Sequence, residues 1–217
     1  MSTSSASRRG AVIIVLLIVV AISGVAIGYG IESTVPTTPK TTTTSGSQAP
    51  YVVTLLIATN STYNSTEGAQ PAYFVLGPKG LQSSANITLP ANQLIKLVIV
   101  CYDDGNSSLE VPNDNVVSGT TDGTIFVASN ANINSSEGPS GIQVKGGQSL
   151  SSVPVADVAH TFSIPSLNLN IPVPTSSTVV AYFTVTKAGT YVWFCETSCG
   201  DAPMSTVGWM RGSVVVQ

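Results

Sequence analysis

The sequence predicts an all-β sandwich that follows a single N-terminal transmembrane helix. Two observations predict the sandwich: short runs of β-type apolar residues recur throughout residues 51–217, and turns rich in Gly, Asn, Ser and Pro separate them. Almost none of this region has the apolar spacing that is typical of a helix. A third observation predicts the transmembrane helix: residues 11–31 are 21 consecutive uncharged, mostly apolar residues, enough to cross a bilayer.

The residues around this span predict how the chain is organised at a membrane. Residues 1–10 include Arg8 and Arg9, and positive charge before a span predicts that this end lies in the cytoplasm. Residues 32–50 are dominated by Thr, Ser and Pro, which predicts an extended stalk. Residues 51–217 would then form an extracellular domain anchored in membrane lipid. A cleaved signal peptide is the alternative, although its apolar core is usually only about 7–15 residues long.

The first half of the domain contains three predicted strands and a less regular region. The run Ile95–Tyr102 has apolar side chains on both faces, as expected for a buried strand. Cys101 lies on the same face of this run as Leu97 and Ile99, so we interpret it as a small core residue. Residues around 106–152 are rich in Gly, Ser and Asn and are interpreted as an insertion with one or two hairpins. The predicted strands are 51–57, 72–76 and 86–102.

The last 65 residues have the clearest β pattern. A strand is expected over Val153–Ile164, with His160 on the same face as Phe162 and Ile164. Further strands are expected over 178–186, 190–194 and 212–217. Residues 187–189 are predicted to form a turn that joins the strands 178–186 and 190–194 as a hairpin.

Composition excludes several classes of function. Charged residues make up 9% of the 217 residues and the net charge is −3, so the chain offers no basic surface for DNA or RNA. The chain contains a single histidine, His160, and neither a phosphate-binding loop nor a paired-carboxylate motif stands out. One histidine leaves little acid–base machinery, so the sequence does not favour a catalytic function.

The segment 189–212 concentrates the residues that can carry chemistry. It contains two cysteines, two methionines, two tryptophans and four glycines between two predicted strands. His160 lies 35 residues upstream of Cys195. Thiolate, imidazole and thioether together are the ligands of copper in electron transfer, because sulfur stabilises Cu(I) and nitrogen accommodates Cu(II). The segment therefore indicates a soft-metal site, a disulfide, or both at different times.

At these residues the chain resembles the cupredoxins, and most closely the copper-bearing subunit II of haem-copper terminal oxidases, in an archaeal-like form with a single anchor. The resemblance implies a Greek-key β-sandwich with copper bound at one end. It covers the last 60 residues closely and the earlier strands only in outline. It is carried by Asp157-Val-Ala-His-Thr-Phe-Ser-Ile-Pro-Ser-Leu, Gly189-x-Tyr191, Cys195-Glu-Thr-Ser-Cys-Gly and Met210-Arg-Gly-Ser-Val-Val-Val.

The resemblance also implies a ligand set for one or two copper ions. In that family two cysteines bridge two coppers, and two histidines, a methionine and a backbone carbonyl complete the site. The second histidine is missing here: Pro203 lies four residues after Cys199, and the loop is four residues longer than the family pattern. Met204, beside the vacant position, is the soft side chain that could replace it. The residues that match are His160, Cys195, Cys199 and Met210, together with the carbonyl of Thr197.

Three hypotheses for the cysteine pair remain open. The first is a modified copper centre with the ligands just named. The second is a Cys195–Cys199 disulfide, because an exterior compartment is oxidising. The third is a mononuclear blue-copper site on Cys195, of the sulfocyanin or halocyanin kind. Zinc held by two cysteines and His160 is also conceivable, but it would leave the methionines unexplained.

Three nearby side chains have possible supporting roles. Trp193 and Trp209 are interpreted either as packing residues or as points of electron entry from a docked donor. Asp157 either holds the His160 imidazole by a hydrogen bond or faces solvent at the end of its strand.

From the resemblance we expect subunit II of a respiratory haem-copper oxidase, which would pass electrons from an external donor to the haem-containing subunit I. The donor would be a small copper protein or a quinol. Two alternatives belong to other classes: a metal-free subunit II of a quinol oxidase that contains the disulfide, and a tethered blue-copper electron carrier.

Overall fold

The computed structural model describes residues 48–59, 69–109, 112–130, 133–134, 143–144 and 146–217. The predicted span 11–31 and nearly all of the stalk lie outside these residues, so the anchor stays a prediction. Within the described part of the chain, no helix has both the length and the apolar character needed to span a bilayer.

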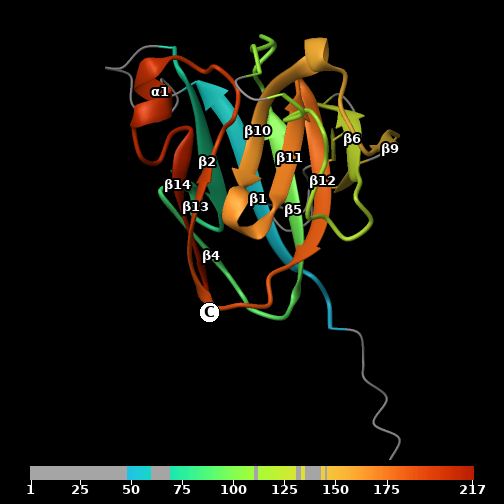
Figure 1. The fold of residues 1–217 in the computed structure, drawn as a ribbon, viewed down its shortest axis with the longest axis vertical. Coiled ribbons are helices and arrows are strands. Elements are labelled where there is room, and N and C mark those ends of the chain that lie inside the picture. Colours follow the sequence, from blue (N-terminus) through green and yellow to red (C-terminus); the bar gives the residue numbers. More distant parts are fainter. Residues whose placement is uncertain (1–47, 60–68, 110–111, 131–132, 135–142, 145) are drawn as a thin grey trace, which may run out of the picture. The chain divides into compact units, whose positions relative to one another are not determined.

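The larger of two main sheets contains seven strands in the order β3-β2-β1-β5-β12-β6-β9. Strand β5 lies near its centre, parallel to β1 and antiparallel to β12. Figure 1 shows these strands as the rear layer of the domain. The bounds are β1 Tyr51–Thr59, β2 Pro71–Gly77, β3 Gly80–Ser83, β5 Leu94–Cys101, β6 Ile125–Ser129, β9 Gln148–Leu150 and β12 Ser177–Thr184.

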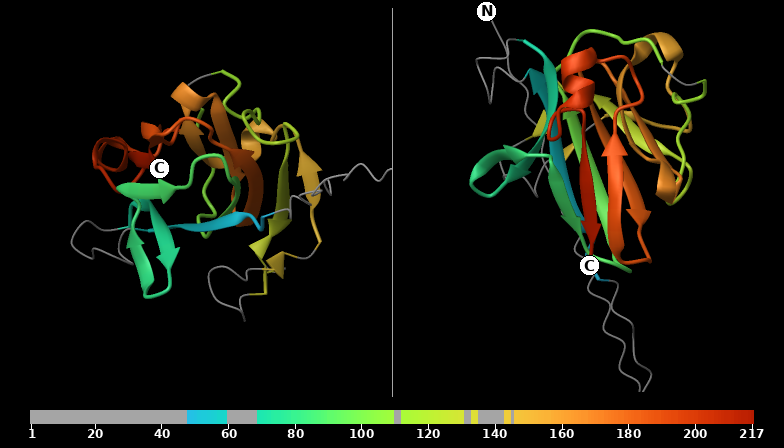
Figure 2. Two further views of the ribbon diagram at one scale, coloured as in Figure 1. Left: turned by 90° about the horizontal axis from the view of Figure 1, so that it is seen from below. Right: turned by 60° about the vertical axis from the view of Figure 1, so that its left-hand side comes forward.

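The smaller sheet contains five strands in the order β11-β10-β13-β14-β4. It packs in front of the larger sheet in Figure 1, and Figure 2 shows the two layers from other directions. This arrangement confirms the predicted all-β sandwich. The bounds are β4 Asn86–Leu89, β10 Val158–Ile164, β11 Leu169–Pro174, β13 Gly189–Phe194 and β14 Arg211–Val216, and a separate pair comprises β7 Ile133–Asn134 and β8 Gln143–Val144.

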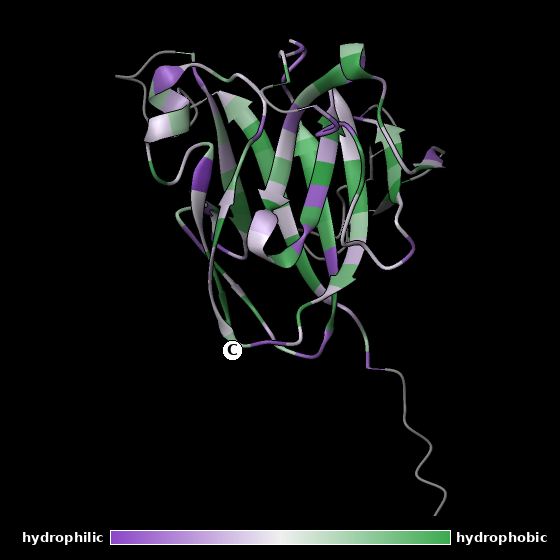
Figure 3. Cartoon of the chain, in the orientation of Figure 1, coloured by the Kyte–Doolittle hydropathy of each residue, from purple (hydrophilic) through white to green (hydrophobic). Residues whose placement is uncertain are grey.

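The core lies between the two sheets, and β5 confirms the prediction of a strand buried on both faces. Ile95, Leu97, Ile99 and Cys101 point into the main core. Val98 and its neighbours on the opposite face form a second, small apolar cluster outside the larger sheet. Apolar residues run along the strands of both sheets in Figure 3, whereas the connecting loops are more polar. Strand β4 instead alternates buried and exposed residues, and burial of one face fixes the register of such a strand.

The predicted hairpin between the strands at 178–186 and 190–194 is wrong. Strand β12 lies in the larger sheet between β5 and β6, whereas β13 lies in the smaller sheet between β10 and β14. Both edges of β12 are already paired, so residues 185–188 carry the chain from one sheet to the other. Val185 is buried in the main core at this crossing. The crossing places the end of β13, and hence Cys195, beside β10.

The region predicted as an insertion, residues 106–152, contributes to the larger sheet. Strand β6 pairs with β12, and β9 pairs with β6 at the edge of the sheet. The short β7–β8 pair lies between β6 and β9 in the sequence. Ile125 of β6 is part of the main core, so this end of the region is integral to the sandwich.

Short helical turns interrupt the β pattern in the part of the chain that the structure describes. Residues Val155–Asp157 form a 3₁₀ turn (η4), so the strand expected from Val153 begins only at Val158. A second 3₁₀ turn (η5) covers Pro165–Leu167. The helix α1 covers Asp201–Ser205, within the loop that is longer than the family pattern. Gly200 precedes α1 with a φ of +91°, a conformation that favours glycine.

Gly212 packs closely against Trp193 and the backbone of Ser84, and we expect Gly212→Ala to destabilise the protein. A Cβ at this position would lie 2.5 Å from Trp193 Nε1 and 2.7 Å from the Ser84 carbonyl oxygen. Overpacking of this kind typically costs about 1–3 kcal/mol of unfolding free energy. Chemical denaturation of the purified chain measures the loss. Gly123→Ala is a control, because a Cβ there meets no atom within 4 Å, although its φ of +64° adds backbone strain.

Candidate metal centre

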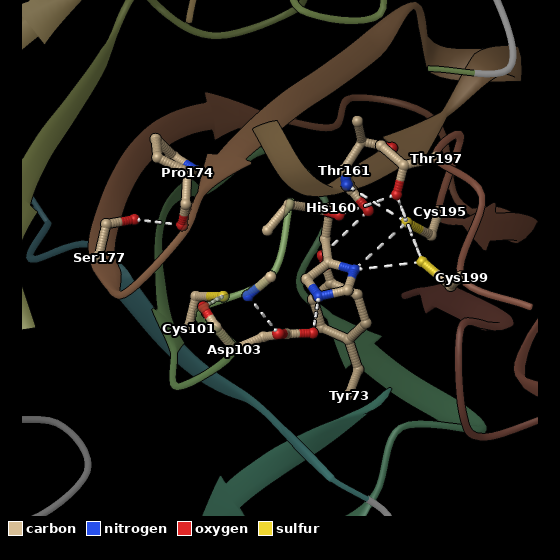
Figure 4. A network of polar contacts seen from close by, with 12 residues as sticks. Tyr73, Cys101, Asp103, His160, Thr161, Pro174, Ser177, Cys195, Thr197 and Cys199 are labelled. Atoms are coloured by element: carbon tan, nitrogen blue, oxygen red, sulfur yellow. Dashed lines mark hydrogen bonds and ion pairs between the residues drawn. The ribbon is translucent and has the colours of Figure 1, made fainter. Parts of the chain in front are cut away.

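Three potential ligands from separate segments meet at one end of the sandwich. His160 comes from β10, Cys195 follows the last residue of β13, and Cys199 lies in the loop before α1. Their ligand atoms all lie within 4.8 Å of one another, and all three residues are buried. Figure 4 shows the imidazole between the two sulfur atoms and a carboxylate. These are the histidine and cysteines that the sequence suggested as ligands.

The imidazole faces the sulfurs through Nδ1. His160 Nδ1 lies 3.2 Å from Cys199 Sγ and 3.9 Å from Cys195 Sγ, and the two sulfurs are 3.4 Å apart. Both cysteines are free thiols, as is the core residue Cys101. The described side chains therefore present two sulfurs and one nitrogen toward a common point.

Backbone hydrogen bonds fix the position of Cys195. Its amide donates to the Met210 carbonyl (2.9 Å), and its sulfur accepts the Thr161 amide (3.3 Å). The next amide, that of Glu196, donates to Thr161 Oγ1 (2.7 Å). Strands β10 and β13 share only the ladder pair Ser163–Phe194. The strands therefore separate after Phe194, and the thiol occupies the space between them.

A carboxylate that the sequence did not single out holds the other side of the imidazole. Asp103 Oδ2 lies 3.0 Å from His160 Nε2, and the Asp103 side chain is 31% exposed whereas that of His160 is 1% exposed. Asp157, the candidate from the sequence, is exposed in the η4 turn, so of its two interpretations the one in which it faces solvent is correct. Its position in the sequence was the available signal, because Asp103 lies two residues after β5, at the strand end that reaches the histidine.

The hydrogen bonds set the charges of the histidine and this aspartate. Burial alone would lower the pKa of His160, but its hydrogen bonds to Asp103 and Cys195 outweigh burial and raise that pKa to about 9. The same hydrogen bond from His160 lowers the pKa of Asp103. The pair is therefore ionic at neutral pH in the metal-free protein.

The two thiols differ in charge. Burial opposes ionisation of Cys195, yet hydrogen bonds from Cys199 and His160 lower its pKa well below the usual value. The pKa of Cys199 is raised, first because it is hydrogen-bonded to Cys195 and then because it is buried. Cys195 is thus the thiolate and Cys199 the thiol that donates to it. Metal binding requires the loss of only that remaining thiol proton and of the imidazolium proton.

Thr197 contacts the cluster through its side chain. Its Oγ1 lies 3.1 Å from Cys195 Sγ and 3.3 Å from Cys199 Sγ, and it donates to the Ala159 carbonyl at 3.0 Å. The residue is completely buried. The sequence had suggested only its backbone carbonyl as a ligand.

The other residues suggested from the sequence lie around the cluster at different depths. Met210 is fully buried in the main core and is tied to Cys195 by the hydrogen bond described above. Met204, in α1, is partly buried against the same core. Trp193 is fully buried and donates from Nε1 to the Ser84 carbonyl, so it cannot touch a docked partner directly. Trp209 is half-buried.

We expect Asp103→Asn to weaken metal binding without removing a ligand. The amide has the shape of the carboxylate but no charge, so it holds the imidazole less firmly and no longer raises its basicity. Loss of such an outer partner typically costs about 10–100-fold in metal affinity. Competition with a chelator of known affinity measures the change. Asp104→Asn is the matched control, because Asp104 is the exposed neighbour; equal losses in both variants would contradict this role for Asp103.

Comparisons with known proteins give no family assignment. No protein-family model matches the chain, and no curated protein matches it.

Several solved copper proteins resemble the structure weakly. The periplasmic domain of cytochrome oxidase subunit II (CoxB) of Bradyrhizobium japonicum is 11% identical, with a TM-score of 0.35 over 78% of this chain and 86% of that one. Rusticyanin from Thiobacillus ferrooxidans is 13% identical, with a TM-score of 0.33 over 80% of this chain and 79% of that one. A multicopper oxidase from Campylobacter jejuni is 8% identical, with a TM-score of 0.36 over 79% of this chain and 31% of its own length. Because these TM-scores are low, the functional assignment rests on the side chains of this chain.

Proposed function

We propose that this chain is a membrane-anchored cupredoxin that transfers electrons through a copper centre held by His160, Cys195 and Cys199. The observation that carries the proposal is the convergence of one imidazole and two free thiols within 4.8 Å in a buried site. This donor set suits copper, because thiolate favours Cu(I) and imidazole also accommodates Cu(II). Asp103, bonded to the ring nitrogen that faces away from the thiols, supplies the outer partner that metal-binding histidines usually have.

Copper bound here would supply a one-electron redox couple. The protein contributes a fixed geometry: β10 holds the imidazole, and the Met210 carbonyl and the Thr161 amide hold Cys195. All three ligand residues are buried, so water is largely kept from the sulfurs. A frame that does not rearrange on gaining or losing an electron suits rapid transfer. Met210 is the candidate for a further, weak thioether ligand.

The wider role we propose is that of subunit II of a respiratory haem-copper oxidase. An electron from an external donor, a small copper protein or a quinol, would pass through the centre to the haem-containing subunit I. The uncharged span 11–31 and the sequence resemblance around Cys195 support this role. The chain would be a single-pass protein of the cell membrane, with its C-terminal domain outside.

Copper loading tests the centre. The full chain, purified in detergent and reduced, is incubated with copper and then freed of excess metal. We expect bound copper and a visible absorption band from sulfur-to-copper charge transfer. A chain that binds no copper and loses two titratable thiols on mild oxidation would instead support the Cys195–Cys199 disulfide of a metal-free subunit.

Co-purification tests the oxidase role separately. A tagged chain isolated from its native membrane should carry a haem-containing subunit. A copper-loaded chain that is isolated without haem would contradict the oxidase role and favour a tethered blue-copper carrier.

A further inference from the structure

The hydroxyl of Thr197 has three neighbours that can accept its single proton. They are the Ala159 carbonyl oxygen at 3.0 Å, Cys195 Sγ at 3.1 Å and Cys199 Sγ at 3.3 Å. A hydroxyl donates one hydrogen bond, so at most one of the three receives it fully. Thr197, Cys195 and Ala159 are all completely buried, so water does not donate a hydrogen bond to an acceptor that the hydroxyl leaves unpaired.

The Ala159 carbonyl lies at an irregularity of β10. The register between β10 and β11 shifts between Val158 and His160, which leaves Ala159 without a partner residue on β11. Such a bulge bends its strand and redirects the groups beside it. The hydrogen bond from Thr197 thus joins the cysteine loop to the peptide unit that directly precedes the histidine.

A cysteine that binds copper does so as a thiolate, which has no proton to donate. In the copper-loaded protein the Thr197 hydroxyl is therefore the donor in a hydrogen bond with either sulfur, and the Oγ1–Sγ distances of 3.1 and 3.3 Å place both sulfurs within its reach. A hydrogen bond to a charged acceptor is roughly twice as strong as one between neutral groups.

Building on the proposed function, we propose that Thr197 is a positioning residue whose hydroxyl donates to a cysteine sulfur in the copper-loaded protein, and that this hydrogen bond raises the reduction potential of the centre. Reduction adds a negative charge to the site, so a donor on sulfur stabilises the reduced form more than the oxidised form. Hydrogen bonding around a cysteine ligand is a recognised determinant of copper potentials.

Thr197→Val tests the proposal because it has nearly the same shape and lacks the hydroxyl. We expect the ratio of Cu(I) to Cu(II) affinities to fall about tenfold, which equals a drop of about 59 mV for a one-electron couple. Spectroelectrochemical titration of the copper-loaded full chain measures it. Thr197→Ser restores a hydroxyl, so its ratio of Cu(I) to Cu(II) affinities should lie within twofold of the wild-type ratio. Thr197→Ala provides a second variant without the hydroxyl if the valine variant does not fold.

Thr178→Val is the matched control. Thr178 is also fully buried, and its hydroxyl donates to Asn130 Oδ1 (2.8 Å) in the larger sheet. This variant should lose stability and keep the wild-type potential. A copper-loaded Thr197→Val or Thr197→Ala with an unchanged potential would overturn the role of Thr197 and leave the copper centre standing. A wild-type chain that takes up no copper would overturn the proposed function and this inference together.

Discussion

Replacing Cys195 with serine is expected to abolish copper binding and the visible absorption band. The thiolate is one of three converging ligand atoms, and the chain contains only one histidine and one cysteine pair in this loop. A serine hydroxyl is a hard, neutral donor that does not replace a thiolate for copper. Copper per chain after loading, measured by mass spectrometry, and the absorption spectrum give the result.

Cys101→Ser is the matched control for this experiment. Cys101 is as deeply buried as Cys195, and its thiol donates to the Asp103 carbonyl at 3.6 Å, a bond that a serine hydroxyl can also make. Burial raises the pKa of Cys101 to about 12, so it stays a neutral thiol. The control should therefore bind copper normally. Copper retained by Cys195→Ser, or lost from both variants alike, would contradict the assignment of the ligands.

The largest expected effect on stability is that of Trp193→Ala. Trp193 is completely buried, and its ring stacks on Phe162 (5.2 Å, 26°) and meets the edge of Tyr73 (5.2 Å, 73°). Truncating a buried tryptophan typically costs about 3–5 kcal/mol, from lost apolar burial and from the cavity that remains. Urea denaturation of the metal-free chain, followed by circular dichroism, measures the change in unfolding free energy.

Two further variants separate the sources of this stability. Trp193→Phe keeps most of the ring and loses the hydrogen bond from Nε1 to the Ser84 carbonyl, so it should cost about 1–3 kcal/mol. Trp209→Ala removes a half-buried ring and should cost less than Trp193→Ala. A loss for Trp209→Ala as large as that for Trp193→Ala would show that burial is not the deciding factor.

The sequence predicts the sandwich well where local pattern and tertiary environment agree. Strand β5 is apolar on both faces because it is covered on both, so its burial can be read directly from Ile95–Cys101. The step from β12 to β13 could not be read in this way. Lys187-Ala188-Gly189 is compatible with a hairpin turn, and only the pairing of β12 with β5 and β6 forces the chain into the other sheet.

Some residues of the candidate site could be predicted from the sequence and others could not. His160, Cys195 and Cys199 could be predicted because one imidazole and two nearby thiols are a typical set of metal ligands. Asp103 is 57 residues from His160, and aspartate is common at strand ends, so only the fold identifies it as the partner. Asp157 was the nearer candidate in sequence, but the η4 turn exposes it. The side-chain role of Thr197 likewise depends on how the loop between the cysteines folds.

The parallel pairing of β1 with β5 has a consequence for how the protein reaches its partners. Tyr51 is aligned with Ile95, and Ile57 with Cys101, beside the aspartate that holds the imidazole. At about 3.3 Å per residue, the entry of the chain into the domain lies roughly 20 Å from the end that holds His160, Cys195 and Cys199. If residues 11–31 anchor the chain as proposed, the length of residues 32–50 would limit which redox partners the proposed centre can approach, and that length could change in evolution without any change in the ligands.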